Sequence, residues 1–369
     1  MSKRIYILNN IFLDKYGNSI SVGGVETYIY NLCQIILDLG IKPVVFQQSN
    51  IPFSIDYSGI LVNGLQERKI ASFVSHAISK IPKNEVLIFA NDEVVYGNYK
   101  GVIINLQHGI GWDFQKHKYR GQIFEKIYQI LMSRDTVRRI KYSQTADYVV
   151  CVDYNYLNWF RTQVNFPKSR FVVIPNFSKV PTTIPIKTSE NINIIFARRF
   201  TTYRGTRIFT EAIRQILNEY SNVKVTFAGS GPDEAWIKEQ LKNYSRVNYI
   251  TYSCDESLEV HADKHIAVIP SIGSEGTSLS LLEAMASGCA VVCTNVGGMT
   301  NIVLDHYNGI MVSPESEQLY TAIKELIDDQ ILRQELAVNA YNTVSKAFSH
   351  DKWEKAWKQL IDEIEKDRE

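Results

Sequence analysis

The chain has 369 residues, of which 45% are hydrophobic and 21% are charged, and its formal net charge is +1. This composition is typical of a folded globular protein and excludes a disordered, collagen-like or disulfide-scaffold chain, while the near-zero charge argues against general nucleic-acid binding. No apolar run reaches the roughly 18 residues of a membrane span, the first residues predict a strand rather than a secretory signal, and five scattered cysteines predict reduced core thiols in a cytoplasmic protein.

Short apolar runs predict two series of parallel strands. The first series comprises residues 4–8, 43–46, 86–90, 102–106, 148–152 and 171–174, and the second comprises 193–196, 223–228, 247–250, 266–269 and 290–293. Helical periodicity separates them at residues 25–39, 121–134, 206–219 and 278–286. Continuous apolar strands alternating with helices predict a doubly wound α/β protein.

The alternation stops once, at residues 175–191, where three prolines stand among polar residues without any period. We therefore predict an N-terminal Rossmann-like domain at 1–178, a linker at 179–191 and a C-terminal Rossmann-like domain at 192–348. Residues 349–369 show an amphipathic pattern and predict a helix that packs back toward the N-terminal domain. Ligands of such sheets bind beyond the carboxyl ends of the strands, so a cleft between the two domains is the expected site.

The most informative motif runs from Ser274 to Gly288, after a predicted strand and into a helix. Glu275 stands in the loop, and Glu283 stands about two turns inside the helix. The backbone N–H groups from Gly276 to Leu279 form an anion site at the helix start. Two carboxylates around an amide nest suit a ligand with hydroxyls at both ends and phosphate between, such as a nucleotide sugar. Alternatively, Glu275 is a solvated capping residue and Glu283 a surface ion-pair partner.

This motif and the sequence AMASGCAVVCTNVGG that completes it resemble the signature of retaining glycosyltransferase family 4, within the glycosyl transferases of group 1. Three further segments support the resemblance: a basic pair, Arg199 and Arg204, around a strand-to-helix turn, the turn at 229–232, and the Gly23-Gly24 loop. Asn176 also matches, although the glycine that often follows it in the family is absent.

The resemblance implies the GT-B fold, two Rossmann-like doubly wound parallel-sheet domains that face a central cleft. It implies that Glu283 binds ribose hydroxyls, that the two arginines bind the diphosphate, and that the leaving phosphate assists deprotonation of the acceptor. The expected catalytic residues are His108, Glu275, Arg199 and Arg204. The expected donor-binding residues are Gly23, Gly24, Arg199, Arg204, Gly276, Thr277, Ser278, Leu279 and Glu283.

No metal ion or cofactor is expected besides the nucleotide-sugar substrate. His261 and His265 have the spacing of zinc ligands on a helix, but Lys264 occupies the position of a base and a strand follows. An Asp-x-Asp motif is absent, and so is the GxGxxG motif of a dehydrogenase after the first strand. Two alternatives stay open: a GT-B nucleotide-sugar epimerase, and a non-catalytic nucleotide-sugar-binding partner subunit.

Charge is distributed unevenly along the chain. Residues 1–180 hold 21 basic and 13 acidic residues, and the remainder holds 19 and 26. Residues 113–141 alone hold eight Lys or Arg, together with apolar residues that share one face of a probable helix. This helix either packs its apolar face into the core or forms an anionic membrane-binding surface. We predict a cytoplasmic protein, either free or peripheral at the inner face of the plasma membrane, with a saccharide or lipid-linked saccharide acceptor in surface polysaccharide biosynthesis.

Overall fold

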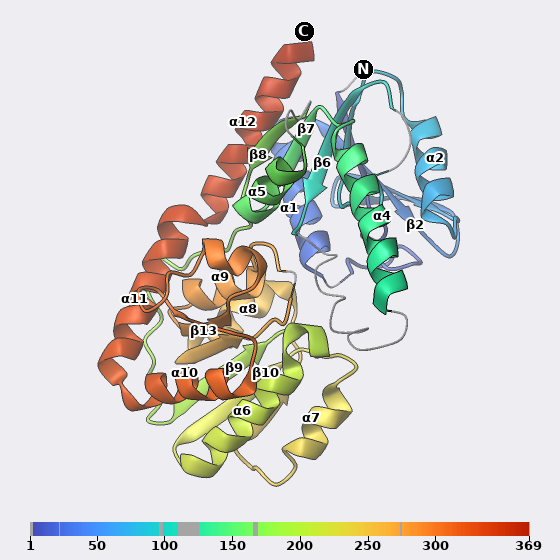
Figure 1. Ribbon diagram of the computed structural model, residues 1–369. Helices are drawn as coiled ribbons and strands as arrows, with labels where there is room; N and C mark the ends of the chain where they lie inside the picture. The colour runs from blue at the N-terminus through green and yellow to red at the C-terminus, as the bar shows by residue number, and fades with distance from the viewer. Residues whose placement is uncertain are drawn as a thin grey trace. The chain divides into compact units, whose positions relative to one another are not determined.

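The computed structural model describes residues 3–21, 23–95, 99–109, 125–164, 169–273 and 275–368. Two compact units divide the chain (Figure 1): unit 1 comprises Met1–Pro175 and Trp353–Glu369, and unit 2 comprises Asn176–Lys352. In the described part of the chain, each unit is built around one sheet of mainly parallel strands, as the sequence predicts.

Unit 1 has an eight-stranded sheet in the order β3-β4-β2-β1-β5-β6-β7-β8 among its described residues, and only the β3–β4 pair is antiparallel. Its strands are β1 (Arg4–Leu8), β2 (Lys42–Gln48), β3 (Phe53–Tyr57), β4 (Ile60–Leu65), β5 (Val86–Phe89), β6 (Val102–Gln107), β7 (Tyr148–Cys151) and β8 (Arg170–Val173). Its helices are α1 (Gly24–Asp38), α2 (Ile70–Lys80), α4 (Glu125–Ser143), α5 (Tyr154–Gln163) and the greater part of α12 (His350–Arg368). The central strands are buried along nearly their whole length because helices cover both faces of a parallel sheet.

Unit 2 has a six-stranded, entirely parallel sheet in the order β11-β10-β9-β12-β13-β14. Its strands are β9 (Ile192–Ala197), β10 (Val223–Ala228), β11 (Val247–Ile250), β12 (Ile266–Ile269), β13 (Ala290–Thr294) and β14 (Ile310–Val312). Its helices are α6 (Thr206–Glu219), α7 (Glu234–Gln240), α8 (Ser257–Ala262), α9 (Leu279–Ala286), α10 (Ser316–Asp328) and α11 (Gln330–Ala347), with short 3-10 turns at Thr202–Arg204, Cys254–Glu256 and Gly297–Asn301. The predicted ranges 206–219, 223–228, 247–250 and 266–269 are confirmed with identical bounds.

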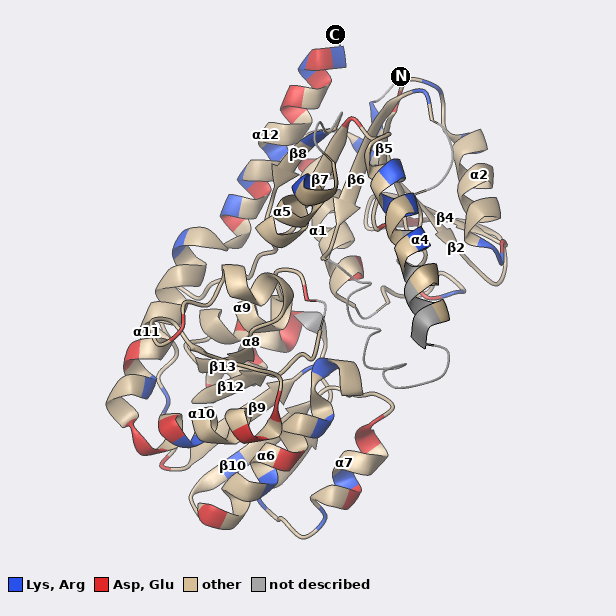
Figure 2. Cartoon of the chain, viewed as in Figure 1, with Lys and Arg blue, Asp and Glu red and all other residues tan. Residues whose placement is uncertain are grey.

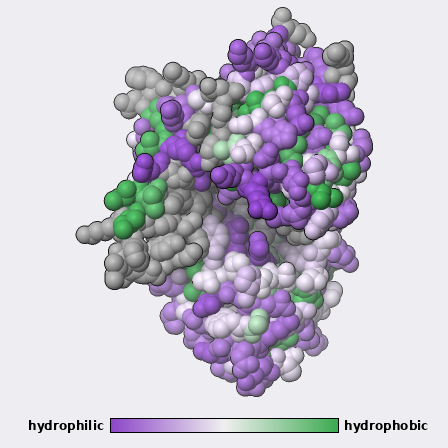
Figure 3. All heavy atoms as spheres, turned by 90° about the vertical axis from the view of Figure 1, so that its right-hand side faces the viewer, coloured by the Kyte–Doolittle hydropathy of each residue, from purple (hydrophilic) through white to green (hydrophobic). Residues whose placement is uncertain are grey.

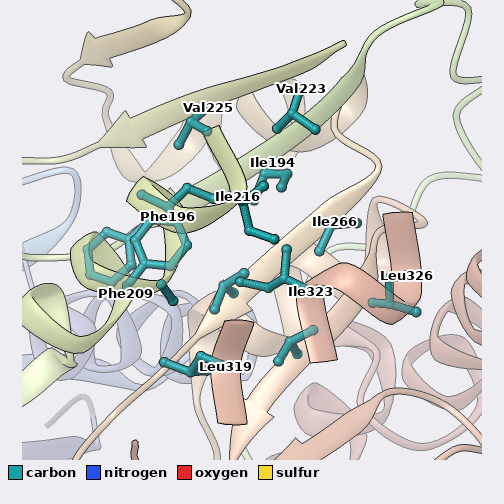
Figure 4. Packing of buried hydrophobic residues seen from close by; sticks show 14 of the residues in the cluster. Ile194, Phe196, Phe209, Ile216, Val223, Val225, Ile266, Leu319, Ile323 and Leu326 are labelled. Atoms are coloured by element: carbon teal, nitrogen blue, oxygen red, sulfur yellow. The ribbon is translucent and has the colours of Figure 1, made fainter. Parts of the chain in front are cut away.

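The core of unit 2 fixes the position of β9 against helices α6 and α10. Figure 4 shows Phe196 of β9 packed with Phe209 of α6 and with aliphatic side chains of α10. The rings of Phe196 and Phe209 stack with their centroids 5.2 Å apart. Because β9 is anchored in this way, the residues that follow it leave the sheet at a defined point.

The β3–β4 hairpin is not predicted from the sequence. Ser58 and Gly59 form its two-residue loop, and both have positive φ angles, 53° and 84°. Two consecutive positive φ angles are typical of a type I′ turn, whose twist matches that of the flanking strands. The alternation of Phe53, Ile55 and Tyr57 with polar residues, followed by the Ser-Gly pair, is the sequence signal that could have revealed this edge hairpin.

The predicted linker, residues 179–191, lies within unit 2 rather than between the units, since the division falls between Pro175 and Asn176. Side-chain hydrogen bonds hold this segment. The Lys187 ammonium donates to the carbonyl oxygens of Ala262 and Ser287, each at 2.7 Å, at the carboxyl ends of α8 and α9. A cation placed at two helix carboxyl ends is electrostatically favourable.

Helix α12 returns the end of the chain to unit 1, where Trp353–Glu369 belong. Its apolar stripe is buried, and the Trp357 indole N–H donates to the Tyr28 hydroxyl of α1 at 2.9 Å. The Tyr148 hydroxyl of β7 donates to Asp367, and Lys3 pairs with Glu365 at 2.8 Å. Within the described residues, none of the helices combines the length and the apolar character that crossing a membrane requires.

Candidate functional site

The candidate site lies where the strand order of unit 2 reverses. Chain connections run outward in opposite directions from the neighbouring strands β9 and β12, and doubly wound sheets bind their ligands outside the carboxyl ends of the strands at such a point. The loop after β9 carries Arg198, Arg199 and Arg204, and the loop after β12 carries Ser271 and Glu275. The motifs that the sequence analysis singled out are therefore brought together at this switch point.

Glycines allow the loops at this edge to pack backbone against backbone. Gly205 has a φ of 77°, and a Cβ atom there would overlap the carbonyl oxygen of Pro270 after β12. Gly231, in the turn after β10, has a φ of 159° and lies against the backbone of Phe200. The Phe200 amide donates to the carbonyl oxygen of Ser230 at 2.8 Å. The glycine motif at 229–232 thus supports the arginine loop.

Glu275 is the centre of a buried ionic cluster. Its Oε1 accepts a hydrogen bond from Arg198 Nη2 at 2.8 Å, and its Oε2 accepts one from the Ser271 hydroxyl at 2.8 Å. The Arg204 guanidinium also donates to Oε2. Arg198 Nη1 donates to Ser271 Oγ at 2.6 Å, which closes the network. The side chains of Glu275 and Arg198 are only 8% and 4% exposed, whereas that of Arg204 is 33% exposed.

The charges of this cluster do not cancel. Burial raises the pKa of Glu275, but Arg198 and Arg204 lower it more, and the resulting pKa is about 2. The carboxylate is therefore ionised at neutral pH and neutralises one of its two guanidinium groups. The cluster keeps one excess positive charge, which favours binding of an anion.

Helix α9 begins four residues after Glu275 and carries Glu283 on its second turn. The first intrahelical N–H bond is that of Leu282 to the carbonyl of Ser278, at 3.1 Å, so the preceding amides have no carbonyl partner inside the helix. Thr277 and Ser278 are each 3% exposed, Gly276 and Leu279 are half-buried, and the Asn176 amide donates to the Thr277 carbonyl at 2.5 Å. Asn176 thereby holds the loop that precedes the helix.

Two alternatives for the motif are wrong. Glu275 is not a solvated capping residue, because it is buried between two arginines. Glu283 forms no ion pair with any residue of the described part of the chain, and burial raises the pKa of its carboxyl. A half-buried carboxyl without an ionic partner is suited to accept hydrogen bonds from hydroxyl groups.

The sequence analysis missed Arg198 and Ser271, which hold Glu275. It named Arg199 instead, which is exposed and pairs with none of the described residues. Both faces of β9 are buried, so apolar alternation does not reveal which of the two consecutive arginines turns inward. An exposed Arg199 and a partly exposed Arg204 remain accessible to an anionic ligand.

The remaining predicted site residues lie in unit 1. His108 directly follows β6, and its Nε2 lies 2.9 Å from the carbonyl oxygen of Ala90. Gly23 caps α1, and its carbonyl accepts hydrogen bonds from the Thr27 amide and hydroxyl, both at 3.0 Å. Gly23 has an extended φ of −179° and Gly24 is exposed, so here the two glycines begin a helix. Their predicted contact with the donor stays a prediction.

The rings of His261 and His265 each have a backbone contact. His261 is 1% exposed, and its Nδ1 lies 2.7 Å from the Ser257 carbonyl oxygen. His265 Nδ1 accepts a hydrogen bond from the Asn193 amide at 3.1 Å. Burial lowers the pKa of each imidazole to about 4, so both are neutral at pH 7.

The predicted basic helix is α4, and residues 113–124 of that segment lie outside the described residues. Ile127, Ile130 and Leu131 are 56%, 61% and 55% exposed, so the interpretation of these residues as a core-packed face is wrong. At about 100° per residue, they share one stripe with Arg134 and Lys141, which are also exposed. Figure 2 shows the basic residues along α4, and Figure 3 shows exposed apolar side chains grouped on one face of the molecule.

Comparisons with known proteins show which family and which fold this chain is similar to. Residues 183–343 match the family of glycosyl transferases group 1. An uncharacterized glycosyltransferase of Methanocaldococcus jannaschii is 27% identical over 56% of this chain. The match covers about half (52%) of that relative's own length. The gpi3 subunit of phosphatidylinositol N-acetylglucosaminyltransferase from Schizosaccharomyces pombe is 24% identical over 84% of this chain and 71% of its own length.

Among solved structures, that of HepE from Anabaena in complex with UDP-glucose is similar over 98% of this chain and 99% of its own, with a TM-score of 0.75 and 16% identity. This likeness shows the GT-B fold and confirms the predicted pair of Rossmann-like domains. The resemblance to group 1 glycosyltransferases is likewise confirmed, while membership of family 4 stays a prediction.

Proposed function

We propose that this chain, whose residues 183–343 match the glycosyl transferases group 1 family, transfers a hexosyl group from a nucleoside diphosphate sugar to a saccharide acceptor. The observation that carries the proposal is the buried cluster of Glu275, Arg198 and Arg204, with its excess positive charge, at the switch point of unit 2. A nucleotide sugar supplies the anionic oxygens that such a cluster and a helix amino end bind. UDP-glucose is the ligand in the similar Anabaena structure, and it is a first candidate donor here.

In the proposed complex, Glu283 accepts hydrogen bonds from the two hydroxyls of the nucleotide ribose. A carboxylate has two oxygens and can accept one hydrogen bond from each hydroxyl of a vicinal diol. The Glu283 carboxylate is half-buried and has no ionic partner among the described residues. The amides at the start of α9 and the guanidinium groups of Arg199 and Arg204 bind the diphosphate. Gly276, Thr277 and Ser278 hold the backbone close to it.

The transfer step follows from this arrangement. The acceptor oxygen forms a bond to the anomeric carbon while the bond from that carbon to the diphosphate breaks, and a phosphate oxygen takes the acceptor proton. Negative charge develops on the departing diphosphate, where Arg199 and Arg204 stabilise it without a metal ion. Because the acceptor oxygen enters and the diphosphate leaves on the same face of the sugar, the configuration at the anomeric carbon is retained.

Glu275 has an electrostatic role in this scheme rather than a covalent one. Both of its oxygens already accept hydrogen bonds, from Arg198, Arg204 and Ser271. A carboxylate held in this way is a poor nucleophile, but its negative charge favours positive charge at the anomeric carbon, and a remaining lone pair can accept from a sugar hydroxyl.

We further propose that the acceptor is a lipid-linked saccharide of surface polysaccharide synthesis, and that α4 binds the anionic inner face of the plasma membrane. The exposed stripe of Ile127, Ile130 and Leu131, continued by Arg134 and Lys141, supports this. Apolar side chains enter the acyl boundary while basic groups contact phosphate headgroups. The overall excess of basic residues in the first half of the chain acts in the same direction.

A second candidate function is that of a subunit in a larger glycosyltransferase complex. One similar protein is named as the gpi3 subunit of such an enzyme. In this function the chain is a non-catalytic partner that binds a nucleotide sugar without turning it over. A nucleotide-sugar epimerase is the other alternative, because it needs the donor site and no saccharide acceptor.

A thermal-shift panel of UDP, GDP, ADP and dTDP with their common sugar conjugates, followed by product analysis, separates these functions. A ligand at 100 times its Kd stabilises the folded state by about 2.7 kcal/mol, which raises Tm by several degrees. Transfer to an added saccharide supports the proposal, conversion of the donor alone supports the epimerase, and binding without turnover supports the subunit. A folded sample that binds none of the nucleotides contradicts all three.

A further inference from the structure

A cluster of aromatic side chains in unit 1 surrounds His108. Tyr28 of α1 is 1% exposed, and its ring meets the His108 ring edge-on, with the centroids 5.0 Å apart and the planes at 86°. Trp353 of α12 lies edge-on to the same tyrosine, also at 5.0 Å. The Trp357 indole N–H donates to the Tyr28 hydroxyl at 2.9 Å. Tyr28 is therefore held from α12 and itself contacts the predicted catalytic histidine.

The contact between His108 and Ala90 determines which nitrogen carries the proton. A carbonyl oxygen has no proton to give, so the Nε2 atom that lies 2.9 Å from it must be the N–H donor. Burial lowers the pKa of His108 to about 4, and the ring is neutral at pH 7. A neutral imidazole with a proton on Nε2 has a bare lone pair on Nδ1. None of the described residues bonds to that Nδ1 atom.

We propose that Tyr28 is a positioning residue for His108, whose ring it holds in the Nε2–H tautomer with Nδ1 presented as an acceptor to a sugar hydroxyl. The part that concerns the sugar rests on the proposed function. Two contacts are needed to fix an imidazole ring: a hydrogen bond that the ring donates along one edge, here to the Ala90 carbonyl oxygen, and a packing contact that prevents rotation about the Cβ–Cγ bond. Tyr28 supplies the second, and Trp357 fixes Tyr28 in turn. The Nδ1 atom of His108 then accepts a hydrogen bond, and the ring stays neutral.

The arrangement predicts different results for two substitutions of Tyr28. Tyr28→Phe keeps the ring beside His108 and removes only the hydroxyl, so the tautomer is retained. Tyr28→Leu removes the edge-on contact, and the imidazole ring of His108 then samples both tautomers. Phe73→Leu is the matched control, because Phe73 of α2 is 0% exposed in the same unit and does not belong to this aromatic cluster.

Long-range ¹H–¹⁵N spectra of the full chain at pH 7 test the proposal, with the His108 signals identified by their loss in His108→Asn. We expect a single Nε2–H tautomer in the wild type, in Tyr28→Phe and in Phe73→Leu, and a mixture in Tyr28→Leu. In the transfer assay, kcat/KM should fall about tenfold in Tyr28→Leu and stay within twofold in Phe73→Leu.

A wild-type His108 with its proton on Nδ1 overturns the proposal without the need for any variant. An unchanged spectrum of a folded Tyr28→Leu protein overturns it as well. If the spectra are as expected but none of the nucleotide sugars binds, the proposed function fails while the positioning of the ring by Tyr28 stands.

Discussion

At the scale of single residues, the buried ion cluster contributes to the stability of unit 2 and underlies the proposed binding of an anionic ligand. Two guanidinium groups around one carboxylate are favourable only while that carboxylate is charged, because an unpaired buried charge is costly. Arg198 is the more deeply buried partner, and Arg204 the more accessible one. Arg198 therefore fixes Glu275, and Arg204 can turn toward an anion without leaving the carboxylate unpaired.

Replacing Glu275 by Gln should lower the free energy of unfolding by about 3 kcal/mol, because Arg198 then lacks its counter-charge. Urea unfolding at pH 7 measures this difference. Glu239→Gln is the control, since Glu239 forms an exposed ion pair with Lys242 at 2.7 Å that contributes little. Equal free energies of unfolding for the two variants would contradict a structural role for the cluster.

The same variant has a defined pH dependence. The pKa of Glu275 is about 2 in the folded protein against an ordinary 4.5, so its contribution to stability is complete above pH 4.5 and is lost as the pH falls toward 2. The difference in unfolding free energy between wild type and Glu275→Gln should therefore be constant from pH 7 to about 5 and shrink below that. A difference that grew on acidification would mean that the folded pKa is raised instead.

The sequence predicts the identity of these residues better than their partners. The spacing of Glu275 and Glu283 placed one in a loop and one inside a helix, and α9 confirms this. It could not distinguish Arg198 from Arg199, because a strand buried on both faces has no polar side to show the direction of each side chain. It also could not show that Ser271, an ordinary polar loop residue, would hold the carboxylate.

At the scale of elements, the loop after β9 depends on a backbone approach that only glycine allows. Gly205→Ala should destabilise unit 2, since the methyl group adds left-handed strain and overlaps the Pro270 backbone. Gly40→Ala is the matched control: Gly40 has a similar φ of 72° but open space around it, so only the strain of about 1–2 kcal/mol applies. Denaturant unfolding should show the Gly205 variant to be less stable by a further 1–3 kcal/mol, roughly. Equal losses would mean that the loop relaxes away from Pro270.

The exposed stripe on α4 makes the membrane proposal testable at the same scale. Arg134→Gln combined with Lys141→Gln should weaken binding to anionic phospholipid vesicles roughly 30-fold, at about 1 kcal/mol for each charge. Lys69→Gln with Lys80→Gln, on exposed positions in and just before α2, removes the same charge elsewhere in unit 1. Vesicle co-sedimentation at low salt compares the two double variants. Equal losses of vesicle binding would mean that net charge, and not the stripe on α4, determines the binding.

Element prediction from sequence succeeded where periodicity was strong. Strands and helices of unit 2 with continuous apolar runs were found to within a residue or two. The edge hairpin β3–β4 was missed, because a half-exposed strand has a weak apolar signal and its turn is encoded by a single Ser-Gly pair. The apolar face of α4 was predicted correctly as a stripe, but periodicity does not tell whether such a stripe meets a core or solvent.

At the scale of the whole molecule, the two sheets and their GT-B architecture followed from strand–helix alternation together with family resemblance. The boundary between the units was not predicted correctly. Proline content indicated a linker at 179–191, but Lys187 holds that segment to unit 2. The Trp357 contact with Tyr28 joins residues 329 positions apart, and a periodic pattern can indicate such a helix face without naming what it meets.

The central claim is that unit 2 binds a nucleotide sugar through Glu283 and the α9 amino end. Calorimetric titration of the best nucleotide sugar from the thermal-shift panel into the full-length wild type, Glu283→Ala and Glu317→Ala tests it most directly. Glu317 is an exposed residue of α10 and serves as the control for the loss of a carboxylate. We expect Glu283→Ala to weaken binding at least tenfold, since hydrogen bonds to a charged group contribute about 1.5–3 kcal/mol, while Glu317→Ala should bind like wild type. Equal affinity of a folded Glu283→Ala protein and the wild type would show that Glu283 does not bind the nucleotide sugar.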